Sequence, residues 1–119
     1  MNYTILAYET AEAYSARTDP NKQENYRAGW MAYSQVLREA GILVTGAGLQ
    51  APDTSTTVKL HNGQRMVQDG PYADTKEQLG GFYVINVPDL DTALGWAARC
   101  PAAIAGGVVE VRPNIQMPS

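Results

Sequence analysis

Histidine and cysteine are nearly absent from this sequence, which contains one of each among its 119 residues. The single cysteine, Cys100, excludes an internal disulfide framework and leaves no ligand set for a structural zinc ion. The single histidine, His61, excludes a metal site built from several histidines and leaves no second imidazole for acid–base chemistry. We therefore expect no metal ion and no cofactor.

Basic residues are also few, with nine lysines and arginines against twelve aspartates and glutamates and a formal net charge of −3. A nucleic-acid-binding surface needs a basic face for phosphate contacts, so we expect no nucleic-acid partner. No apolar run approaches the roughly 18 residues of a membrane span. The N-terminal segment MNYTILAYET also lacks the basic region of a secretion signal. These absences predict a cytoplasmic protein with no membrane partner.

The composition that remains is typical of a folded domain. Hydrophobic residues make up 45% of the chain and charged residues 18%, which excludes disorder caused by low hydrophobicity. A chain of this length buries roughly two thirds of its unfolded surface, which is enough for a core. Because no repeat, low-complexity tract or linker is found, residues 1–119 are interpreted as one domain.

Local patterns predict six strands and two helices. Asp19-Pro20 is typical of a helix start, and apolar side chains follow at helical spacing. Asn62-Gly63 is a strong signal for a hairpin with a type I′ turn, in which both turn positions need positive φ. Asp89 is typical of the N-cap of a second helix. We expect strands at 3–8, from 42, at 56–61, 64–68, 80–87 and 108–112, and helices at 20–40 and 90–99.

This order of elements predicts an α+β fold with both helices on one face of a mainly antiparallel sheet. It is the ferredoxin-like split βαβ pattern with an inserted β-hairpin. The other face of the sheet would keep more apolar side chains than the helices can cover, and a second copy of the chain is the simplest partner for it. The apolar residues assigned to that face are Leu6, Tyr8, Val58, Leu60, Tyr83 and Ile85.

The densest polar segment runs over residues 69–81 and contains three carboxylates, a lysine and three glycines. Loops on a rigid scaffold commonly hold functional residues. Asp69 is the candidate catalytic residue, a base fixed between a strand end and Gly70-Pro71. The alternative role is structural, with its oxygens accepting hydrogen bonds from N–H groups near residues 75–77. The candidate substrate-binding residues are Tyr8, Gly70, Pro71, Tyr72, Thr75, Lys76 and Arg112.

Other residues with chemical potential receive simpler interpretations. His61 precedes the hairpin turn and is interpreted as an exposed turn residue. Cys100 lies at the C-terminal end of the second helix, where the helix dipole disfavours a thiolate. The aromatic residues Tyr26, Trp30 and Tyr33 lie on the apolar stripe of the first helix and are interpreted as core.

A motif at Asp69 connects the chain with a known family. The run DGPYADTKEQLGGFYVINVPDLDTALGWAARCPAA, followed by VEVRP, resembles the DGPF-type proteins of the YCII-related family, as do Tyr8-Glu9 and the GAGL segment. The resemblance implies a bacterial, cytoplasmic protein that forms a dimeric α+β barrel and has no established activity. Tyr72 replaces the usual phenylalanine of the motif. The wider family has a proposed catalytic His–Asp pair, for which this chain offers only His61 as the histidine.

Two functions are consistent with these observations. The first is a small-molecule-binding or enzyme-like homodimer with its site near the Asp-Gly-Pro loop. The alternative is a non-catalytic dimerising module that acts on a regulatory protein partner, since the resemblance implies genes that often lie near those of extracytoplasmic-function sigma factors. A pocket that holds Asp69 would favour the first function, and a flat packed interface would favour the second. A metal or haem protein has the least support, because a histidine ligand is hard to place.

Overall fold

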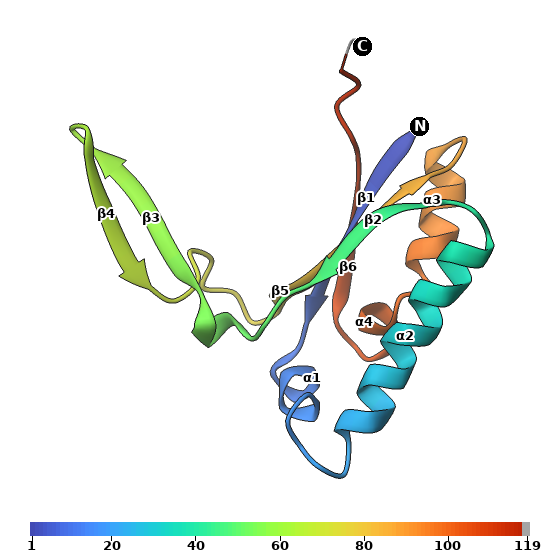
Figure 1. Ribbon diagram of the computed structural model, residues 1–119, viewed down its shortest axis with the longest axis horizontal. Coiled ribbons are helices and arrows are strands. Elements are labelled where there is room, and N and C mark those ends of the chain that lie inside the picture. The colour runs from blue at the N-terminus through green and yellow to red at the C-terminus, as the bar shows by residue number, and fades with distance from the viewer. Residues whose placement is uncertain (118–119) are drawn as a thin grey trace.

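The computed structural model of the chain describes residues 1–117. Over these residues it has a mixed α+β fold with antiparallel sheets (Figure 1). The strands are β1 (Asn2–Glu9), β2 (Leu43–Gly48), β3 (Thr56–His61), β4 (Gln64–Asp69), β5 (Gln78–Asn86) and β6 (Val108–Pro113). The helices are α1 (Ala11–Ala16), α2 (Gln23–Glu39), α3 (Leu90–Ala97) and α4 (Pro101–Ile104), with a short 3-10 helix at Pro52–Thr54.

The main sheet has four strands in the order β2-β5-β1-β6, and every pair in it is antiparallel. Strand β5 lies between β1 and β2, and β1 lies between β5 and β6. Each β-helix-β unit is therefore split by a strand of the other, as the order of sequence elements predicted. The hairpin β3-β4 forms a separate two-stranded sheet.

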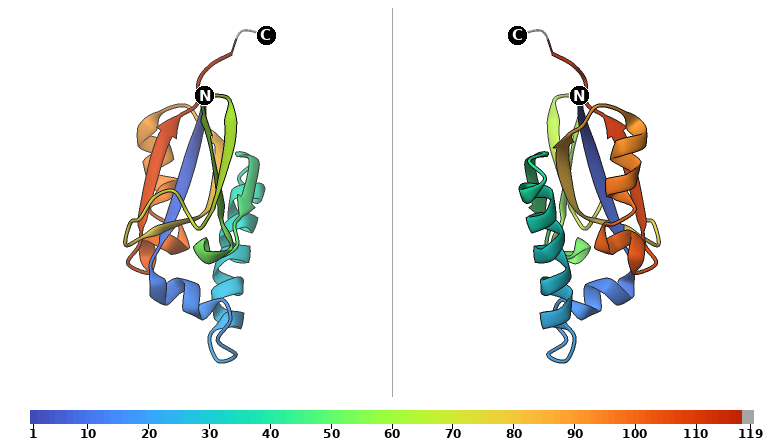
Figure 2. Two further views of the ribbon diagram at one scale, coloured as in Figure 1. Left: turned by 90° about the vertical axis from the view of Figure 1, so that its left-hand side faces the viewer. Right: turned by 90° about the vertical axis from the view of Figure 1, so that its right-hand side faces the viewer.

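The hydrophobic core lies on one face of the main sheet, under α2, α3 and α4 (Figure 2). Alternate residues of β1, namely Tyr3, Ile5 and Ala7, point into this core. Helix α2 contributes Tyr33 and Leu37 from its apolar stripe. The period-2 pattern of β1 and the helical stripe of α2 therefore meet in one layer, as expected for an amphipathic helix on a sheet.

Among residues 1–117 no helix covers the opposite face of the sheet, and the composition of that face differs from the expectation. Tyr83 and Ile85 pack in the helix-side core, so their assignment to the open face was wrong. Val58 and Leu60 belong to the separate hairpin and were also misplaced. Every second pair of the β1-β5 ladder points to the open face, and Tyr8 lies on that face beside these pairs. The residues on the open face are Thr4, Leu6, Tyr8, Phe82 and Val84.

The first residues of the two long helices show that one expected helix start was wrong and that the other was right. Helix α2 begins at Gln23 with Lys22 as its N-cap, so Asp19-Pro20 does not start it. The Asp19 carboxylate instead accepts a hydrogen bond from the Asn21 N–H at 2.9 Å, which holds a turn before the helix. Asp89 is the N-cap of α3, as predicted, and accepts from the Thr92 N–H at 2.8 Å.

The hairpin β3-β4 projects away from the rest of the molecule (Figure 1). Asn62 and Gly63 have φ of 50° and 78°, which confirms the predicted turn with two positive φ values. The radius of gyration is 16.0 Å, against about 13.5 Å for a compact domain of this length. Since Val58 and Leu60 on β3 are 56% and 75% exposed, the hairpin contributes surface without contributing to the core.

Candidate functional site

Glu9 is a carboxylate buried at the core-facing end of β1. It continues the alternation of Tyr3, Ile5 and Ala7, and its side chain is only 1% exposed. Oε1 accepts a hydrogen bond from the Tyr26 hydroxyl at 2.6 Å, and Oε2 accepts one from Nη2 of Arg17 at 2.8 Å. A buried carboxylate is costly unless it is paired and hydrogen-bonded, and both conditions are met here.

Arg17 joins this carboxylate to four other parts of the chain. Its Nε donates to the Tyr26 hydroxyl at 2.9 Å, Nη1 donates to the Leu49 carbonyl, and Nη2 also donates to the Gly80 carbonyl at 3.3 Å. The guanidinium lies 4.7 Å from the centroid of the Tyr14 ring, a cation–π distance. We call Glu9, Tyr14, Arg17 and Tyr26 the Glu9 cluster; it connects β1, α1, α2 and β5.

Burial keeps the phenols of the Glu9 cluster protonated. Burial, followed by the hydrogen bond to Glu9, raises the pKa of Tyr26 to about 12. Burial and the nearby Glu9 charge also raise the pKa of Tyr14. Tyr26 therefore donates its proton to Glu9 while its oxygen accepts from Arg17. Tyr14 donates to the Gln78 carbonyl at 2.8 Å. The cluster is a closed hydrogen-bond network at neutral pH.

A register shift in the sheet places the backbone against this cluster. Ala7 pairs with Gly81 and Tyr8 pairs with Leu79, so Gly80 is the extra residue of a β-bulge. Bulges often lie beside functional sites because they redirect the chain locally. Here the bulge turns the Gly80 carbonyl toward Arg17 and brings its glycine α-carbon close to Glu9.

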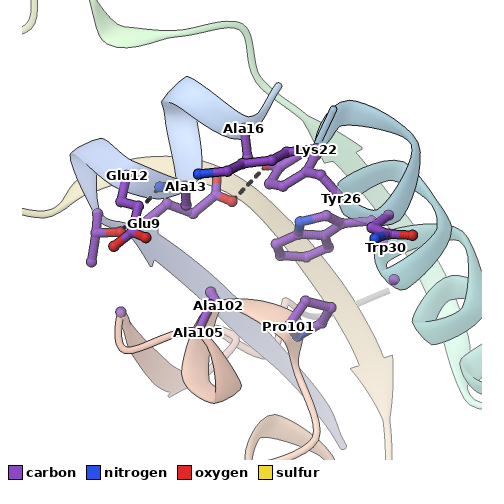
Figure 3. A pocket seen from close by; sticks show the side chains of 14 residues that line it. Glu9, Glu12, Ala13, Ala16, Lys22, Tyr26, Trp30, Pro101, Ala102 and Ala105 are labelled. Atoms are coloured by element: carbon purple, nitrogen blue, oxygen red, sulfur yellow. Dashed lines mark hydrogen bonds between the residues drawn. The ribbon is translucent and has the colours of Figure 1, made fainter. Parts of the chain in front are cut away.

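A cavity of about 520 Å³ opens beside the Glu9 cluster (Figure 3). We call it the helix cavity, because α1, α2 and α4 provide most of its walls. Tyr26 and Trp30 form one side, and Pro101 and Ala102 face them from the other (Figure 3). Polar groups at its edges come from Glu12, Lys22 and Asn25. Its mainly apolar lining and few polar groups are typical of small-molecule pockets.

The Asp-Gly-Pro segment borders a different hollow, of about 510 Å³, that reaches the open face of the sheet at Tyr8. We call it the Asp-Gly-Pro hollow. It brings together four of the residues selected from the sequence, although Tyr72 is 80% exposed. Those four are Tyr8, Pro71, Tyr72 and Thr75. Gly70 is next to them at the hairpin base, where Thr57 donates to its carbonyl at 2.7 Å.

Asp69 is the last residue of β4, and its side chain is exposed. It does not line the Asp-Gly-Pro hollow. Within residues 1–117 the structure shows no hydrogen bond to its carboxylate, so the expected cap from residues 75–77 is not present. Gln78 takes that role instead: its side-chain amide donates to the Ala73 and Thr75 carbonyls at 3.0 and 2.7 Å.

Neither Lys76 nor Arg112 lines the Asp-Gly-Pro hollow. Lys76 is an exposed residue of the loop before β5. Arg112 pairs with Thr4 whereas Val108 pairs with Tyr8, which separates Arg112 from Tyr8 by about 13 Å along the strand. Arg112 instead forms an exposed ion pair with Glu110, with Nε and Oε2 at 2.6 Å. Arg112 is therefore remote from the hollow, whereas Lys76 directly follows Thr75, which lines it.

His61 and Asp69 lie at opposite ends of the hairpin. His61 pairs with Gln64, and Asp69 is five residues farther along β4, which corresponds to about 17 Å. A His–Asp pair within one chain is therefore absent from the described residues. Cys100 is fully buried, and burial raises the pKa of its thiol, which fits the expectation of an unreactive cysteine.

Within residues 1–117, no group of three or more histidine, cysteine, aspartate or glutamate side chains could hold a metal ion. None of the helices in that part of the chain is both long and apolar enough to cross a membrane.

Glu9 was not predicted as a site residue, although the sequence contains a signal for it. Tyr3, Ile5 and Ala7 are alternate residues of the first strand, and continuing that alternation places Glu9 on the same face. A carboxylate at a core-facing position needs a cationic or hydrogen-bonding partner. Arg17 lies eight residues later and could have been considered as that partner.

Comparisons with known proteins agree with this architecture. The model of the YCII-related domain matches residues 1–118. An uncharacterised protein of Rhizobium meliloti (strain 1021) is 35% identical over 114 residues, which is 95% of this chain and 91% of that protein. Among solved structures, the fold is similar to 5-chloro-2-hydroxyhydroquinone dehydrochlorinase from Burkholderia phenoliruptrix AC1100 in complex with 2,5-dihydroxybenzoquinone. That similarity covers 98% of this chain and 96% of the enzyme, with a TM-score of 0.57 and 16% identity. The family match extends over nearly the whole sequence, and the chain belongs to the YCII-related family.

Proposed function

We propose that this YCII-related protein binds a small organic molecule in its helix cavity, in the bacterial cytoplasm, and works as an enzyme-like homodimer. The observation that carries the proposal is the cavity of about 520 Å³ with Trp30 and Pro101 on facing walls and the Glu9 cluster at one end. A volume in this range encloses a molecule of one or two rings. The rigid cluster fixes the wall formed by Tyr26, so the cavity is present before the ligand binds.

The similarity in fold supports a ligand of this size. The dehydrochlorinase was solved with 2,5-dihydroxybenzoquinone, a single substituted ring. At 16% identity the comparison concerns the fold alone, so it gives a probe molecule and not a reaction.

Gly29 allows a test that leaves the fold intact. It lines the helix cavity on α2, and a β-carbon there would meet no atom within 4 Å. Gly29→Leu should fill the cavity while favouring the helix by about 0.5–1 kcal/mol. Gly95→Leu is the matched control, because Gly95 is an exposed glycine of α3 with the same free space. The measurement is a thermal-shift and NMR screen of single-ring compounds, including 2,5-dihydroxybenzoquinone. We expect Gly95→Leu to keep binding and Gly29→Leu to lose it; equal binding by both variants would contradict this location.

The Asp-Gly-Pro hollow is a second candidate location for the same function. The convergence of Tyr8, Pro71, Tyr72 and Thr75 favours it. Asp69 would then act from the rim of the hollow, with Gly70 shaping the loop and Lys76 supplying a mobile positive charge. If Tyr8→Ala abolishes binding while Gly29→Leu does not, the ligand lies in the Asp-Gly-Pro hollow.

The homodimer is proposed to be an α+β barrel in which the open faces of two sheets pack together. The open face carries Leu6, Tyr8 and Phe82, with no helix over it. The projecting hairpin gives each chain an arm that can reach its partner, which accounts for a radius of gyration above that of a compact monomer. Sedimentation at micromolar concentration should give twice the monomer mass of 12.9 kDa. A monomer under those conditions would contradict the barrel.

A non-catalytic interaction module is the second candidate function, and the hairpin favours it. Val58 and Val67 are paired across the hairpin and are 56% and 55% exposed. An apolar surface on a projecting arm is typical of a site for a protein partner. In that case Val58→Thr with Val67→Thr should abolish binding to a regulatory partner such as a sigma factor, and the ligand screen above should give no binder.

A further inference from the structure

A separate hollow lies between α2 and the strands β2 and β5, with a volume of about 550 Å³. We call it the α2-β2 groove. On the helix side, Arg27, Met31, Ser34 and Arg38 follow one another three or four residues apart, so they share one face of α2. The strand side consists mainly of backbone and small residues at 47–48 and 80–81. Glycine at three of those four positions leaves space for a ligand close to the main chain.

The charged residues that line the groove within residues 1–117 are all arginines. Among the described residues that line it there is no aspartate or glutamate. Arg17 is neutralised by Glu9, but Arg27 and Arg38 form no ion pair within residues 1–117. Arg38 makes one hydrogen bond there, from Nη2 to the side-chain oxygen of Gln35 at 3.1 Å. Two guanidinium groups that form no ion pair in the described residues attract anions to the groove.

The middle of the groove is aromatic, and one end has hydroxyl groups. The rings of Trp30 and Tyr83 are nearly parallel, at 16°, with centroids 6.2 Å apart, and Tyr26 adds a third ring with its centroid 6.4 Å from that of Trp30. The Tyr83 hydroxyl lies 2.5 Å from Oγ of Ser34, which is one helical turn before Arg38. Flat rings pack well on such a surface, and a guanidinium beside hydroxyl groups suits a planar carboxylate.

We propose that the α2-β2 groove binds an aromatic carboxylate, with the ring against Trp30 and Tyr83 and the carboxylate on Arg38 beside Ser34. Arg27, at the other end of the helix face, increases the attraction for the anion. The proposal goes beyond the function proposed above, because it assigns a charge and a shape to a ligand and places it outside the helix cavity. Trp30 is shared by both hollows, whereas Arg27 and Arg38 line only the groove.

Three probe compounds distinguish the contribution of the ligand's charge from that of its ring shape. Each compound is titrated into the full chain, and NMR chemical shifts report binding. Benzoate is the aromatic anion, benzamide has the same shape without charge, and cyclohexanecarboxylate has the charge without a flat ring. We expect benzoate to bind about tenfold more tightly than either comparison compound, because benzamide lacks the charge-assisted hydrogen bond and cyclohexanecarboxylate lacks the flat ring that packs on Trp30. Equal binding of benzoate and benzamide would overturn the charge assignment. Equal binding of benzoate and cyclohexanecarboxylate would overturn the aromatic one.

Arg38→Gln tests the anchor. Arg38 is exposed on α2, so the variant should fold like the wild type, and its melting curve checks this. We expect it to lose the tenfold preference for benzoate. Arg65→Gln is the matched control, because it removes the same charge from an exposed position on the hairpin. Wild-type benzoate affinity in Arg38→Gln, or no benzoate binding at millimolar concentration in the wild type, would overturn the proposal.

Gly29→Leu separates this proposal from the function proposed above. That variant closes the helix cavity and should leave benzoate binding unchanged. If benzoate binding is lost in Gly29→Leu but kept in Arg38→Gln, the ligand lies in the helix cavity; the groove proposal is then wrong while the small-molecule function stands.

Discussion

A β-carbon on Gly80 would lie 1.9 Å from Oε2 of Glu9 and 2.8 Å from its Cδ. The carboxylate has no room to move away, because Arg17 and Tyr26 hold its two oxygens. Glycine at position 80 is therefore required by a side chain from a neighbouring strand and not by its own φ. The bulge, the ion pair and the absence of a side chain at position 80 depend on one another.

Gly80→Ala should lower the free energy of unfolding by about 1–3 kcal/mol, because the added methyl group must displace Glu9 or the strand. Urea unfolding of the wild type and the variant measures the difference. Gly95→Ala is the control, since a β-carbon at Gly95 meets no atom within 4 Å and should stabilise α3 by a few tenths to about 1 kcal/mol. Equal stability of Gly80→Ala and the wild type would show that Glu9 is not fixed in this position.

Arg17→Met should be more damaging than the double variant Glu9→Gln with Arg17→Met. The single change leaves a buried carboxylate without its cation, which costs about 3–5 kcal/mol. The double variant removes the charge as well and should recover part of that loss. A double-mutant cycle in urea gives the coupling energy. Strictly additive effects of the two single changes would mean that the ion pair contributes nothing to stability.

Stability should fall steeply in alkaline solution because of the buried tyrosines. Burial is the main cause that raises the pKa values of Tyr14, Tyr26, Tyr33 and Tyr83, and that of Tyr26 is raised to about 12. Above the normal tyrosine pKa of about 10 the unfolded chain loses these protons while the folded chain keeps them, so unfolding is favoured. For Tyr26 this loss begins near pH 10 and continues to about pH 12.

Each such tyrosine contributes up to about 1.4 kcal/mol per pH unit in this range. Urea unfolding at a series of pH values from 9 upward measures the slope. Tyr26→Phe should be less stable at neutral pH, because Glu9 loses a donor, and should show a shallower alkaline slope. An unchanged slope in Tyr26→Phe would contradict the burial of this phenol.

Asp69→Asn should leave the melting curve within about 0.5 kcal/mol of the wild type, because the carboxylate is exposed and accepts no hydrogen bond in the described chain. The same variant tests the catalytic assignment. If Asp69 acts on a ligand in the Asp-Gly-Pro hollow, Asp69→Asn keeps its stability and loses turnover or binding. A clear loss of stability in Asp69→Asn would instead support the structural role, in which the carboxylate accepts hydrogen bonds that this structure does not show.

Gly63→Val should disturb the hairpin without unfolding the main sheet. Gly63 has φ of 78°, where a β-branched residue is strained by about 1–3 kcal/mol. Because the hairpin lies outside the core, the strain should appear as faster amide hydrogen exchange at Lys59 and Met66, with β1 and β5 unaffected. Unchanged exchange at these amides would contradict the type I′ turn.

The strands and long helices could be predicted because each follows one periodicity. Tyr3, Ile5 and Ala7 alternate, and Tyr33 and Leu37 recur one helical turn apart, so local pattern and burial agree. Helix α1 was missed because it is only six residues long, and a helix so short depends on tertiary contacts such as that between Tyr14 and Gln78.

The faces of β5 could not be predicted, for a different reason. Tyr83 and Ile85 were assigned to the open face because nothing in the local sequence fixes the register of β5 against β1. Strand β5 pairs with β1 in one continuous register from Asn86 to Gly81, and the bulge at Gly80 shifts it by one residue beyond that point. The candidate residues near Asp69 were selected because they are polar and lie close together in the sequence. The Glu9 cluster could not be selected in this way, because it forms only when distant segments of the chain come together in the fold.

The sequence of the projecting hairpin can differ among members of the family without destabilising the rest of the fold. No residue of β3 or β4 belongs to the core cluster, so their length and composition are not constrained by packing against the helices. Differences among YCII-related proteins in what they recognise should therefore accumulate between Thr56 and Asp69. A short epitope inserted at the Asn62-Gly63 turn should likewise be displayed in solution by an otherwise native protein.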